Sequence, residues 1–310
     1  MVVVTGANGF IGRALMAELS VRGLSSRGTV SRSDVTLRSC ECVVVGDMNE
    51  STDWHAALAG AAEVVHLAAL PYTKHDNVED FFAAFRSVNV GGTLNLARHA
   101  AIAGIKRFVF ISSVKVNGNS TPPGVAFTEL DAPKPQDVYG QTKHEVERSL
   151  RQLSADTGME IVIIRAPMVY GSGAKANFAA LMRAVQRGWP LPLGRIHNQR
   201  SFVALDNLVD FIVICITRPQ AANQTFLVSD GQDLSTTELV RGMAEAAGVP
   251  AHLLPVPVWA LQAGASLLGN GYAVQRLCGN LQVDISKALS FLGWVPPLSV
   301  EEGLKRAVTV

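Results

Sequence analysis

The sequence predicts a doubly wound α/β fold, in which helices cover both faces of a parallel β-sheet, with a smaller C-terminal part. Short runs rich in β-branched residues alternate with helical patterns from the first residue to about Arg165. These runs are apolar almost throughout, as strands are when both faces of a parallel sheet are covered. The alternation itself is typical of successive βαβ units.

The elements are expected in a simple order along the first half of the chain. Strands are expected in "MVVVTG" (1–6), "GTVSRS" (28–33), "ECVVVGDM" (41–48), "AEVVHLAAL" (62–70), "KRFVFISS" (106–113) and "EIVIIRAP" (160–167). Helices are expected in "FIGRALMAELSVRG" (10–23), "SVNVGGTLNLARHAAIAG" (87–104) and "VYGQTKHEVERSLRQLSADTG" (138–158). In such sheets ligands bind at the carboxyl ends of the strands.

The second half of the chain has a different rhythm. Its loops are longer and contain Pro and Gly, as in "LLPVPVWALQAGASLLGNG" (253–271). We predict two parts, residues 1–170 and 171–310, with segments such as 200–216 returning to the first part. The cleft between the two parts is the expected binding site.

Composition excludes several classes of function. The 310 residues are 48% apolar and 17% charged, and 27 basic side chains face 26 acidic ones. No basic stripe is available for nucleic acid or for an anionic membrane surface, so neither is expected as a partner. The first residues already form a strand, which leaves no room for a signal peptide. The apolar runs fall short of the about 20 residues that span a bilayer, so we expect a cytoplasmic protein without membrane insertion.

The cysteines and histidines give no sign of a metal site. Cys40, Cys42, Cys215 and Cys278 fit neither a zinc spacing nor a disulfide framework. His66 has no second histidine or carboxylate at ligand spacing, and we expect it to be a hydrogen-bonded histidine at a strand end. We therefore predict no metal.

A glycine-rich loop joins the first strand to the first helix. In "VTGANGFIG", glycines at this point allow a tight turn and bring backbone N–H groups and a helix N-terminus close to a pyrophosphate. The spacing is G-x-x-G-x-x-G, so a plain turn remains the alternative. We predict that residues 1–170 are mainly a Rossmann-type dinucleotide-binding domain, with these loop residues at the cofactor: Gly6, Asn8, Gly9, Phe10, Ile11 and Gly12.

The end of the second strand bears on the choice between NAD and NADP. An NAD enzyme would place an acidic residue there for the ribose hydroxyls, whereas this chain has Ser31 and Arg32. Because a guanidinium binds a 2'-phosphate well, NADP(H) is favoured and NAD(H) remains possible. A solvated arginine is the alternative, with Asp34 close by. Asp47 and Met48, which close the third strand, are candidates for the adenine pocket.

"VYGQTK" places Tyr139 and Lys143 four residues apart at the start of a helix, so both side chains share one face. A neighbouring ammonium favours the phenolate and is expected to lower the tyrosine pKa. The pair would then serve as a proton donor and acceptor. Such spacing is common on helices, and taken alone it is a structural feature.

The combination of the glycine loop, a strand ending in Ser112-Ser113 and the Tyr139/Lys143 helix resembles the extended short-chain dehydrogenase/reductase family of sugar-nucleotide epimerases, dehydratases and reductases. The resemblance covers nearly all 310 residues. It extends to "HLAA" (66–69), "VNVGGTLNL" (88–96), "RAPMVYG" (165–171), "RSFVALDNLVD" (200–210) and "LGWVPPLSVEEGL" (292–304).

The resemblance implies roles for three residues. Tyr139 is the acid/base, Lys143 orients the nicotinamide ribose and tunes the tyrosine, and Ser113 hydrogen-bonds the reacting sugar oxygen. Ser113 is chosen over Ser112 because the family hydroxyl stands five residues before the glycine of a V-Y-G triplet. Here the triplet is V-N-G, and Asn117 replaces the family tyrosine.

The resemblance also implies two further sets of contacts. Asn89 is expected to position active-site backbone or water, with a purely structural role as the alternative. The remaining cofactor contacts are Leu67, Ala68, Ala69, Asn89 and Pro167. Residues 171–310 would mainly bind the sugar nucleotide, a UDP-sugar. The expected substrate contacts are Ser113, Lys115, Asn177, Phe178, Leu191, Leu193, Arg200 and Arg276. For Arg276 the alternative is an exposed helix arginine without a ligand.

The expected reaction follows from what stands after the catalytic hydroxyl. The family's 4,6-dehydratases have Asp-Glu there, and this chain has Val114 and Lys115, so dehydration is disfavoured. The absence of an acid after the second strand and the presence of Arg32 favour NADPH and a reduction. The segments "ISSVKVNG" (111–118), "KANFAALMRAVQRGWPLPLG" (175–194) and "RSFVALDNLVD" (200–210) resemble bacterial reductases of UDP-4-keto-6-deoxy-N-acetylhexosamines. This resemblance implies reduction of the C4 ketone to UDP-N-acetylquinovosamine or UDP-N-acetylfucosamine for O-antigen and lipopolysaccharide synthesis. The alternatives are a UDP-sugar 4-epimerase with tightly bound NAD and a non-catalytic dinucleotide-sensing regulator. A homodimer through helices at 89–103 and 139–155 is also expected.

Overall fold

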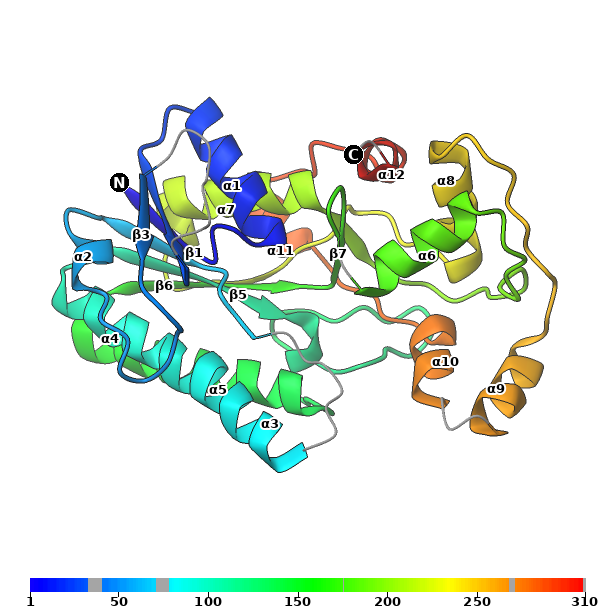
Figure 1. Cartoon of the computed structure of the whole chain (residues 1–310), viewed down its shortest axis with the longest axis horizontal. Coiled ribbons are helices and arrows are strands. Elements are labelled where there is room, and N and C mark those ends of the chain that lie inside the picture. The colour runs from blue at the N-terminus through cyan, green and yellow to red at the C-terminus, as the bar shows by residue number, and fades with distance from the viewer. Residues whose placement is uncertain (33–40, 71–77, 175, 268–270, 309–310) are drawn as a thin grey trace.

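The computed structural model describes residues 1–32, 41–70, 78–174, 176–267 and 271–308. Seven parallel strands form one sheet in the order β3-β2-β1-β4-β5-β6-β9, with helices on both faces (Figure 1). The predicted doubly wound α/β fold is confirmed. The strands are β1 (Val2–Thr5), β2 (Ser26–Val30), β3 (Glu41–Val44), β4 (Glu63–His66), β5 (Arg107–Ser113), β6 (Glu160–Ala166) and β9 (Thr225–Leu227).

The strand order places a switch point at the middle of the sheet. The chain runs from β1 outward through β2 to β3, and then returns to place β4 on the other side of β1. Thr5 pairs with Thr29 on one side and with His66 on the other. Connections therefore leave β1 and β4 in opposite directions, and the crevice at their carboxyl ends is where such sheets bind ligands.

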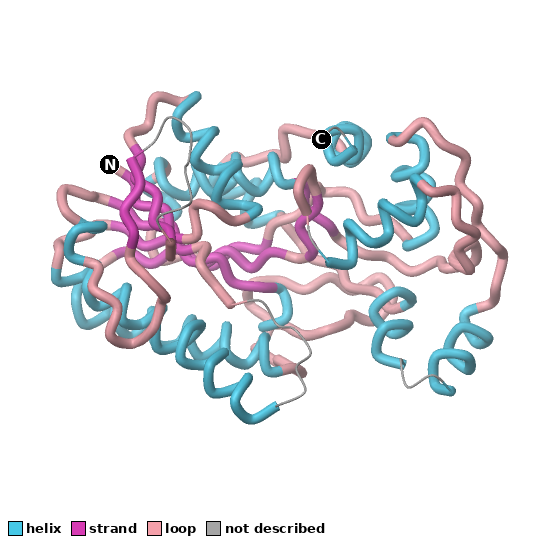
Figure 2. The backbone as a smooth tube through the Cα atoms, viewed as in Figure 1, coloured by secondary structure: helices cyan, strands magenta, loops and turns pink. Residues whose placement is uncertain are grey.

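Two hydrophobic clusters fill the two faces of the sheet. One face is covered by α1, α7 and α11, and the other by α2, α4 and α5. Figure 2 shows the strands in the interior with these helices around them. The helices of this part are α1 (Phe10–Val21), α2 (His55–Leu58), α3 (Val78–Arg86), α4 (Thr93–Ile102), α5 (Val138–Thr157), α7 (Leu205–Thr217) and α11 (Ser286–Leu292).

Three short helical segments complete this part of the fold. Ser87–Gly92 is a π-helical segment that joins α3 to α4, and such segments are frequent at functional sites. The other two, Val114–Val116 and Pro219–Ala221, are 3₁₀ turns.

A smaller two-stranded sheet begins where β6 ends. Pro167 follows Ala166, and because it has no N–H it cannot extend the ladder. The next residues form β7 (Met168–Tyr170), which pairs in parallel with β8 (Phe202–Ala204). A third hydrophobic cluster packs these strands against α6 (Ala176–Gln186), α8 (Thr236–Ala246) and α12 (Val300–Val308), and α9 (Val258–Leu267) and α10 (Gly271–Cys278) lie beside this part.

The later segments α7, β9 and α11 pack on the large sheet although they follow residue 170. The division into 1–170 and 171–310 stays a prediction. Cys42, Cys215 and Cys278 are free thiols, and Cys40 lies outside the described residues. Across the described helices, none combines the length and the apolar character that crossing a bilayer requires.

Candidate active site

The glycine loop is a cradle that side chains would fill. Gly6 has a positive φ of 65°, and a Cβ built on it would lie 2.9 Å from the Ala68 backbone N. A Cβ on Gly12 would lie 2.2 Å from the Gly6 carbonyl oxygen. Gly9 stands at the N-cap of α1, where no side chain caps the helix. The loop therefore leaves a helix N-terminus accessible to a pyrophosphate, as such loops do.

A cavity of about 250 Å³ opens beside this loop. Predicted cofactor residues from the glycine loop, the ends of β2 and β3, and the segment after β4 meet there. The lining is Gly6, Asn8, Gly9, Thr29, Val30, Ser31, Val45, Gly46, Met48, Trp54, Leu67, Ala68 and Ala69. Asp47 and Arg32 are exposed neighbours of this lining, and Asp34 lies outside the described residues. Phe10, Ile11 and Gly12 form the first turn of α1.

Trp54 is a lining residue that the sequence did not single out. Its side chain is buried, and its indole N–H has no hydrogen-bond partner among the described residues. The pattern "TDWHAAL" carries no signal that distinguishes this tryptophan from an ordinary core residue. The cradle, the cavity and the helix N-terminus together fit a dinucleotide.

His66 belongs to a hydrogen-bond network at the end of β4. The Thr93 hydroxyl donates to the Asn89 carbonyl, so it accepts from Nε2–H of His66 at 2.9 Å. The Thr5 hydroxyl accepts from the backbone N–H groups of residues 67 and 68 and donates to Nδ1 of His66 at 2.7 Å. Burial, aided by Lys143, lowers the pKa of His66 to about 3. The imidazole is therefore neutral, with its proton on Nε2.

Asn89 continues this network toward the cofactor wall. It is buried in the π-helical segment, and its amide both accepts from the Leu70 N–H (2.8 Å) and donates to the Leu70 carbonyl (3.0 Å). The bonded backbone follows Leu67, Ala68 and Ala69 directly. Asn89 thus holds the backbone of this segment through Leu70, and its role at the cofactor stays a prediction.

Ser112 and Ser113 at the end of β5 point in opposite directions, as neighbours on a strand do. The Ser112 hydroxyl donates to the buried Glu147 carboxylate at 2.6 Å. The Ser113 oxygen instead accepts from the Lys115 N–H at 3.3 Å, where the chain turns away from the sheet. This geometry supports Ser113 rather than Ser112 as the hydroxyl available to a ligand.

Tyr139 and Lys143 lie together on the first turns of α5. The Lys143 ammonium is 5.8 Å from the centroid of the Tyr139 ring and donates to the Ile111 carbonyl at 2.9 Å. Burial lowers the pKa of Lys143 to about 8, against the opposing effect of Glu147. The pair is therefore assembled at the carboxyl end of β5, beside Ser113.

The acidity of Tyr139 differs from the expectation. Burial, with a smaller effect of Asp137, raises the pKa of Tyr139 to about 12 instead of lowering it. The expected direction of the Tyr139 pKa shift was wrong, because the expectation considered only the neighbouring ammonium. It left out desolvation and the Asp137 carboxylate. Asp137 was detectable, since an Asp directly before a helix is a common N-cap.

A buried ion pair lies behind these residues. Glu147 on α5 and Arg165 on β6 make two hydrogen bonds, of 3.0 and 2.6 Å, and their side chains are 0% and 2% exposed. Arg165 also donates to the side-chain oxygen of Asn117 at 3.0 Å, and the Asn117 amide donates to the Thr128 carbonyl. Asn117, in place of the family tyrosine, is therefore part of a polar network that joins the active-site wall to β6.

The predicted sugar-nucleotide residues differ in their surroundings. Phe178 and Leu193 belong to the hydrophobic core, where Phe178 stacks on Tyr170, while Asn177 is exposed and Leu191 is half-buried beside that core. The surroundings of Arg200 suit binding of an anion. Burial and the nearby Arg276 lower the pKa of Arg200 to about 10, and its guanidinium donates to the Gly279 carbonyl.

Two guanidinium groups that repel one another favour an anion between them, such as a diphosphate. Lys115 was also expected at the substrate, and it pairs with Asp137. Ser113 pairs with Ala166 on the neighbouring strand, and Pro167 is the residue after Ala166. In the part of the chain that the structure describes, no group of three or more His, Cys, Asp and Glu residues is placed to hold a metal ion.

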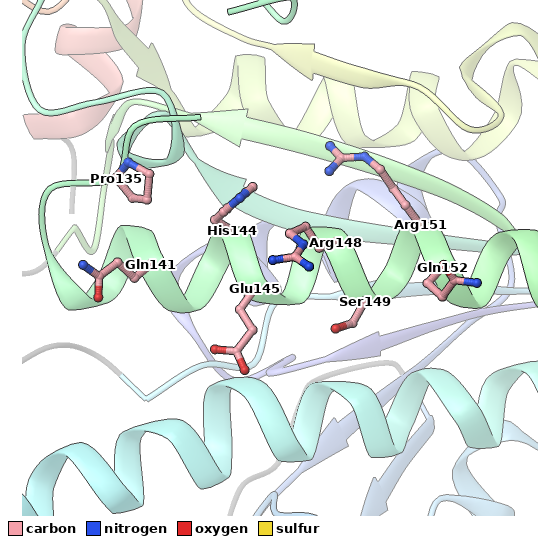
Figure 3. A pocket seen from close by; sticks show the side chains of 8 residues that line it. All are labelled: Pro135, Gln141, His144, Glu145, Arg148, Ser149, Arg151 and Gln152. Carbon is pink, nitrogen blue, oxygen red and sulfur yellow. The ribbon is translucent and has the colours of Figure 1, made fainter. Parts of the chain in front are cut away.

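A separate open groove of about 890 Å³ runs along the outer face of α5. Figure 3 shows side chains projecting into it from successive turns of that helix, and its lining is Pro135, Gln141, His144, Glu145, Arg148, Ser149, Arg151 and Gln152. It contains none of the predicted cofactor or substrate residues. It does lie on a helix expected at a dimer contact, and that contact stays a prediction.

Comparison with known proteins agrees with this geometry. Residues 2–229 match the NAD dependent epimerase/dehydratase family. A UDP-glucose 4-epimerase of Vibrio cholerae is 46% identical over 311 residues, which cover 98% of this chain and 93% of the relative.

Solved structures show the same fold. MoeE5 in complex with UDP-glucuronic acid and NAD is 26% identical, with a TM-score of 0.79 over 99% of this chain and 97% of that chain. The UDP-glucose 4-epimerase of Thermus thermophilus in complex with NAD is 20% identical, with a TM-score of 0.77 over 99% and 97% of the two chains. The chain thus belongs to the NAD dependent epimerase/dehydratase family.

Proposed function

We propose that this protein is a UDP-sugar 4-epimerase that interconverts UDP-glucose and UDP-galactose with NAD held in the site. The observation that carries the proposal is the 46% identity to the Vibrio cholerae UDP-glucose 4-epimerase over 98% of the chain. The arrangement of Ser113, Tyr139 and Lys143 supports it. The comparisons support the epimerase alternative better than the 4-keto reductase that the sequence analysis favoured, and the reductase becomes the contrary outcome of the test.

The proposed chemistry assigns proton transfer to Tyr139. Its phenolate takes the proton of the sugar C4 hydroxyl and returns it to the C4 oxygen after the keto sugar has turned over. Ser113 hydrogen-bonds that oxygen, and the Lys143 ammonium favours the phenolate. When bound, oxidised NAD would supply an acceptor for the C4 hydride, which is later returned to C4. It would also supply a positive charge beside the phenol.

Val114 and Lys115 support hydride chemistry without elimination. Loss of water requires a general acid and a general base near C5 and C6, and neither a valine nor a lysine paired with Asp137 provides a carboxylate there. The two guanidinium groups at positions 200 and 276 are proposed to bind the UDP diphosphate. Arg200 is half-buried, and partial exclusion of water strengthens such a pair.

NAD is proposed instead of the NADP expected from Ser31 and Arg32. Both residues are exposed at the end of β2, and an exposed arginine is compatible with either cofactor. The family is NAD-dependent, and the neighbours above were solved with NAD. Replacement of Arg32 by Ala is therefore expected to leave the retained nucleotide unchanged.

The test uses purified protein with no added cofactor. Incubation with UDP-glucose is expected to give UDP-galactose, followed by proton NMR of the anomeric signals, and denaturation is expected to release NAD, identified by chromatography. A second reaction contains UDP-4-keto-6-deoxy-GlcNAc with NADPH or NADH. Consumption of NADPH there, without interconversion of UDP-glucose, would establish the reductase and refute the epimerase.

A further inference from the structure

Lys115 is a charged residue of the active-site wall that the proposed chemistry does not use. It lies in the 3₁₀ turn Val114–Val116, directly after Ser113 and β5. Its ammonium is 5.8 Å from the centroid of the Tyr139 ring, the same distance as the Lys143 ammonium. The tyrosine ring is therefore flanked by two lysines from different elements, and the family motif accounts for only one of them.

Asp137 connects Lys115 to the start of the catalytic helix. One carboxylate oxygen accepts from the Gly140 N–H at 2.8 Å and so caps α5, while the other pairs with the Lys115 ammonium. The carboxylate stands two residues before Tyr139. A negative charge at this position opposes ionisation of the phenol.

In the part of the chain that the structure describes, the carboxylates in the first half of α5 are paired with arginines. On α5, Glu147 is paired with Arg165 and Arg151, and Glu145 is paired with Arg86 of α3. Lys143 donates to a backbone carbonyl, and on β4 His66 is neutral. Among the described residues, Lys115 is a cation that pairs with the Asp137 carboxylate.

We propose that Lys115 is a positioning residue for Tyr139, which acts by pairing with Asp137 so that the helix cap is held and its negative charge is offset beside the phenol. This reassigns Lys115 from a sugar-contacting role to one exerted through Asp137. The inference rests on the proposed function only in taking Tyr139 as the acid/base.

The test compares variants that change one charge each. Lys115→Met removes the positive charge that pairs with Asp137, and a unit charge about 6 Å away in a partly hydrated site shifts a pKa by roughly half to one unit. The Tyr139 pKa is expected to rise by that amount. Asp137→Asn is expected to lower it, while the asparagine oxygen still caps the helix. Lys115→Arg keeps the charge and is the rescue variant.

The phenol is titrated directly, without turnover. Protein that retains its nucleotide is prepared with 3-fluorotyrosine, which is more acidic than tyrosine, and fluorine NMR follows each ring with pH. Tyr139→Phe identifies the signal by its loss. The pH profile of kcat is the second readout, and its rise toward alkaline pH is expected to move up in Lys115→Met and down in Asp137→Asn.

Equal titration of Tyr139 in wild type, Lys115→Met and Lys115→Gln would overturn the inference, as would shifts of the same sign in the Lys115→Met and Asp137→Asn variants. The two proposals fail separately. Opposite shifts in a protein that does not epimerise UDP-glucose would refute the proposed function and uphold the role of Lys115. Epimerisation of UDP-glucose by a protein whose Tyr139 titration is the same in all variants would uphold the proposed function and refute the role of Lys115.

Discussion

Replacing Glu147 by Gln is predicted to destabilise the fold strongly, because it leaves the Arg165 charge buried without a counter-ion. The two side chains are 0% and 2% exposed, and two guanidinium bonds to the carboxylate are affected. Breaking one side of such a buried pair costs about 3–5 kcal/mol. That is a large fraction of the about 5–15 kcal/mol by which domains are stable.

The assay is urea unfolding followed by circular dichroism, with a control on the same helix. Glu145 pairs with Arg86 where the side chains are 41% and 56% exposed, so Glu145→Gln is expected to cost about 0–1 kcal/mol. A double variant, Glu147→Leu with Arg165→Met, removes both charges and is expected to recover much of the loss. A Glu147→Gln variant as stable as Glu145→Gln would refute the reasoning.

The pair also predicts a dependence on pH. Burial alone would raise the pKa of Glu147, but Arg165, together with Ser112 and Arg151, outweighs burial and the pKa lies below its usual value. A carboxyl group with a depressed folded-state pKa stabilises the fold fully above its unfolded pKa, near 4.5. That contribution is lost as the pH falls through the folded value, so the unfolding free energy of Glu147→Gln should vary less with pH in acid.

Three further predictions concern the site. Tyr139→Phe should reduce kcat by about 10²–10⁴-fold, the usual size of acid–base catalysis, while UDP-glucose binding measured by calorimetry changes little; near-normal turnover would remove Tyr139 from the mechanism. Gly12→Ala should release the nucleotide, because its Cβ would lie 2.2 Å from the Gly6 oxygen, whereas Gly264→Ala, with open space around it, should retain the nucleotide; equal nucleotide content would contradict the cradle. Arg200→Met should weaken UDP binding about tenfold or more, since a charge-assisted hydrogen bond is worth about 1.5–3 kcal/mol, and unchanged affinity would remove Arg200 from the diphosphate site.

The sheet and its covering helices followed from pattern alone. Strands such as 106–113 are buried along their whole length from residue 107. Because both faces of such a strand are covered, the sequence shows a nearly continuous apolar run. The glycine loop was also accessible, because its spacing lies within nine neighbouring residues between a strand and a helix. These features depend on short stretches of neighbouring residues.

Features that depend on distant residues were not accessible. Glu147 and Arg165 are 18 positions apart and meet only when α5 packs on β6. Phe178 and Leu193 also pack in one hydrophobic cluster with residues of α8 and α12, which lie far from them in the sequence. The direction of the Tyr139 pKa also required the folded structure, because burial outweighs the lysine that the sequence shows beside it.

The cluster on the α1 and α7 face of the sheet has a consequence for synthesis. It includes Val2 at one end of the chain and Trp294 near the other, so the sheet face made first is covered by segments made last. At about 5–20 residues per second, a ribosome exposes that apolar face for several seconds before α7 and α11 emerge. The nascent chain is then a substrate for chaperones, and fragments that stop at residue 170 are expected to aggregate.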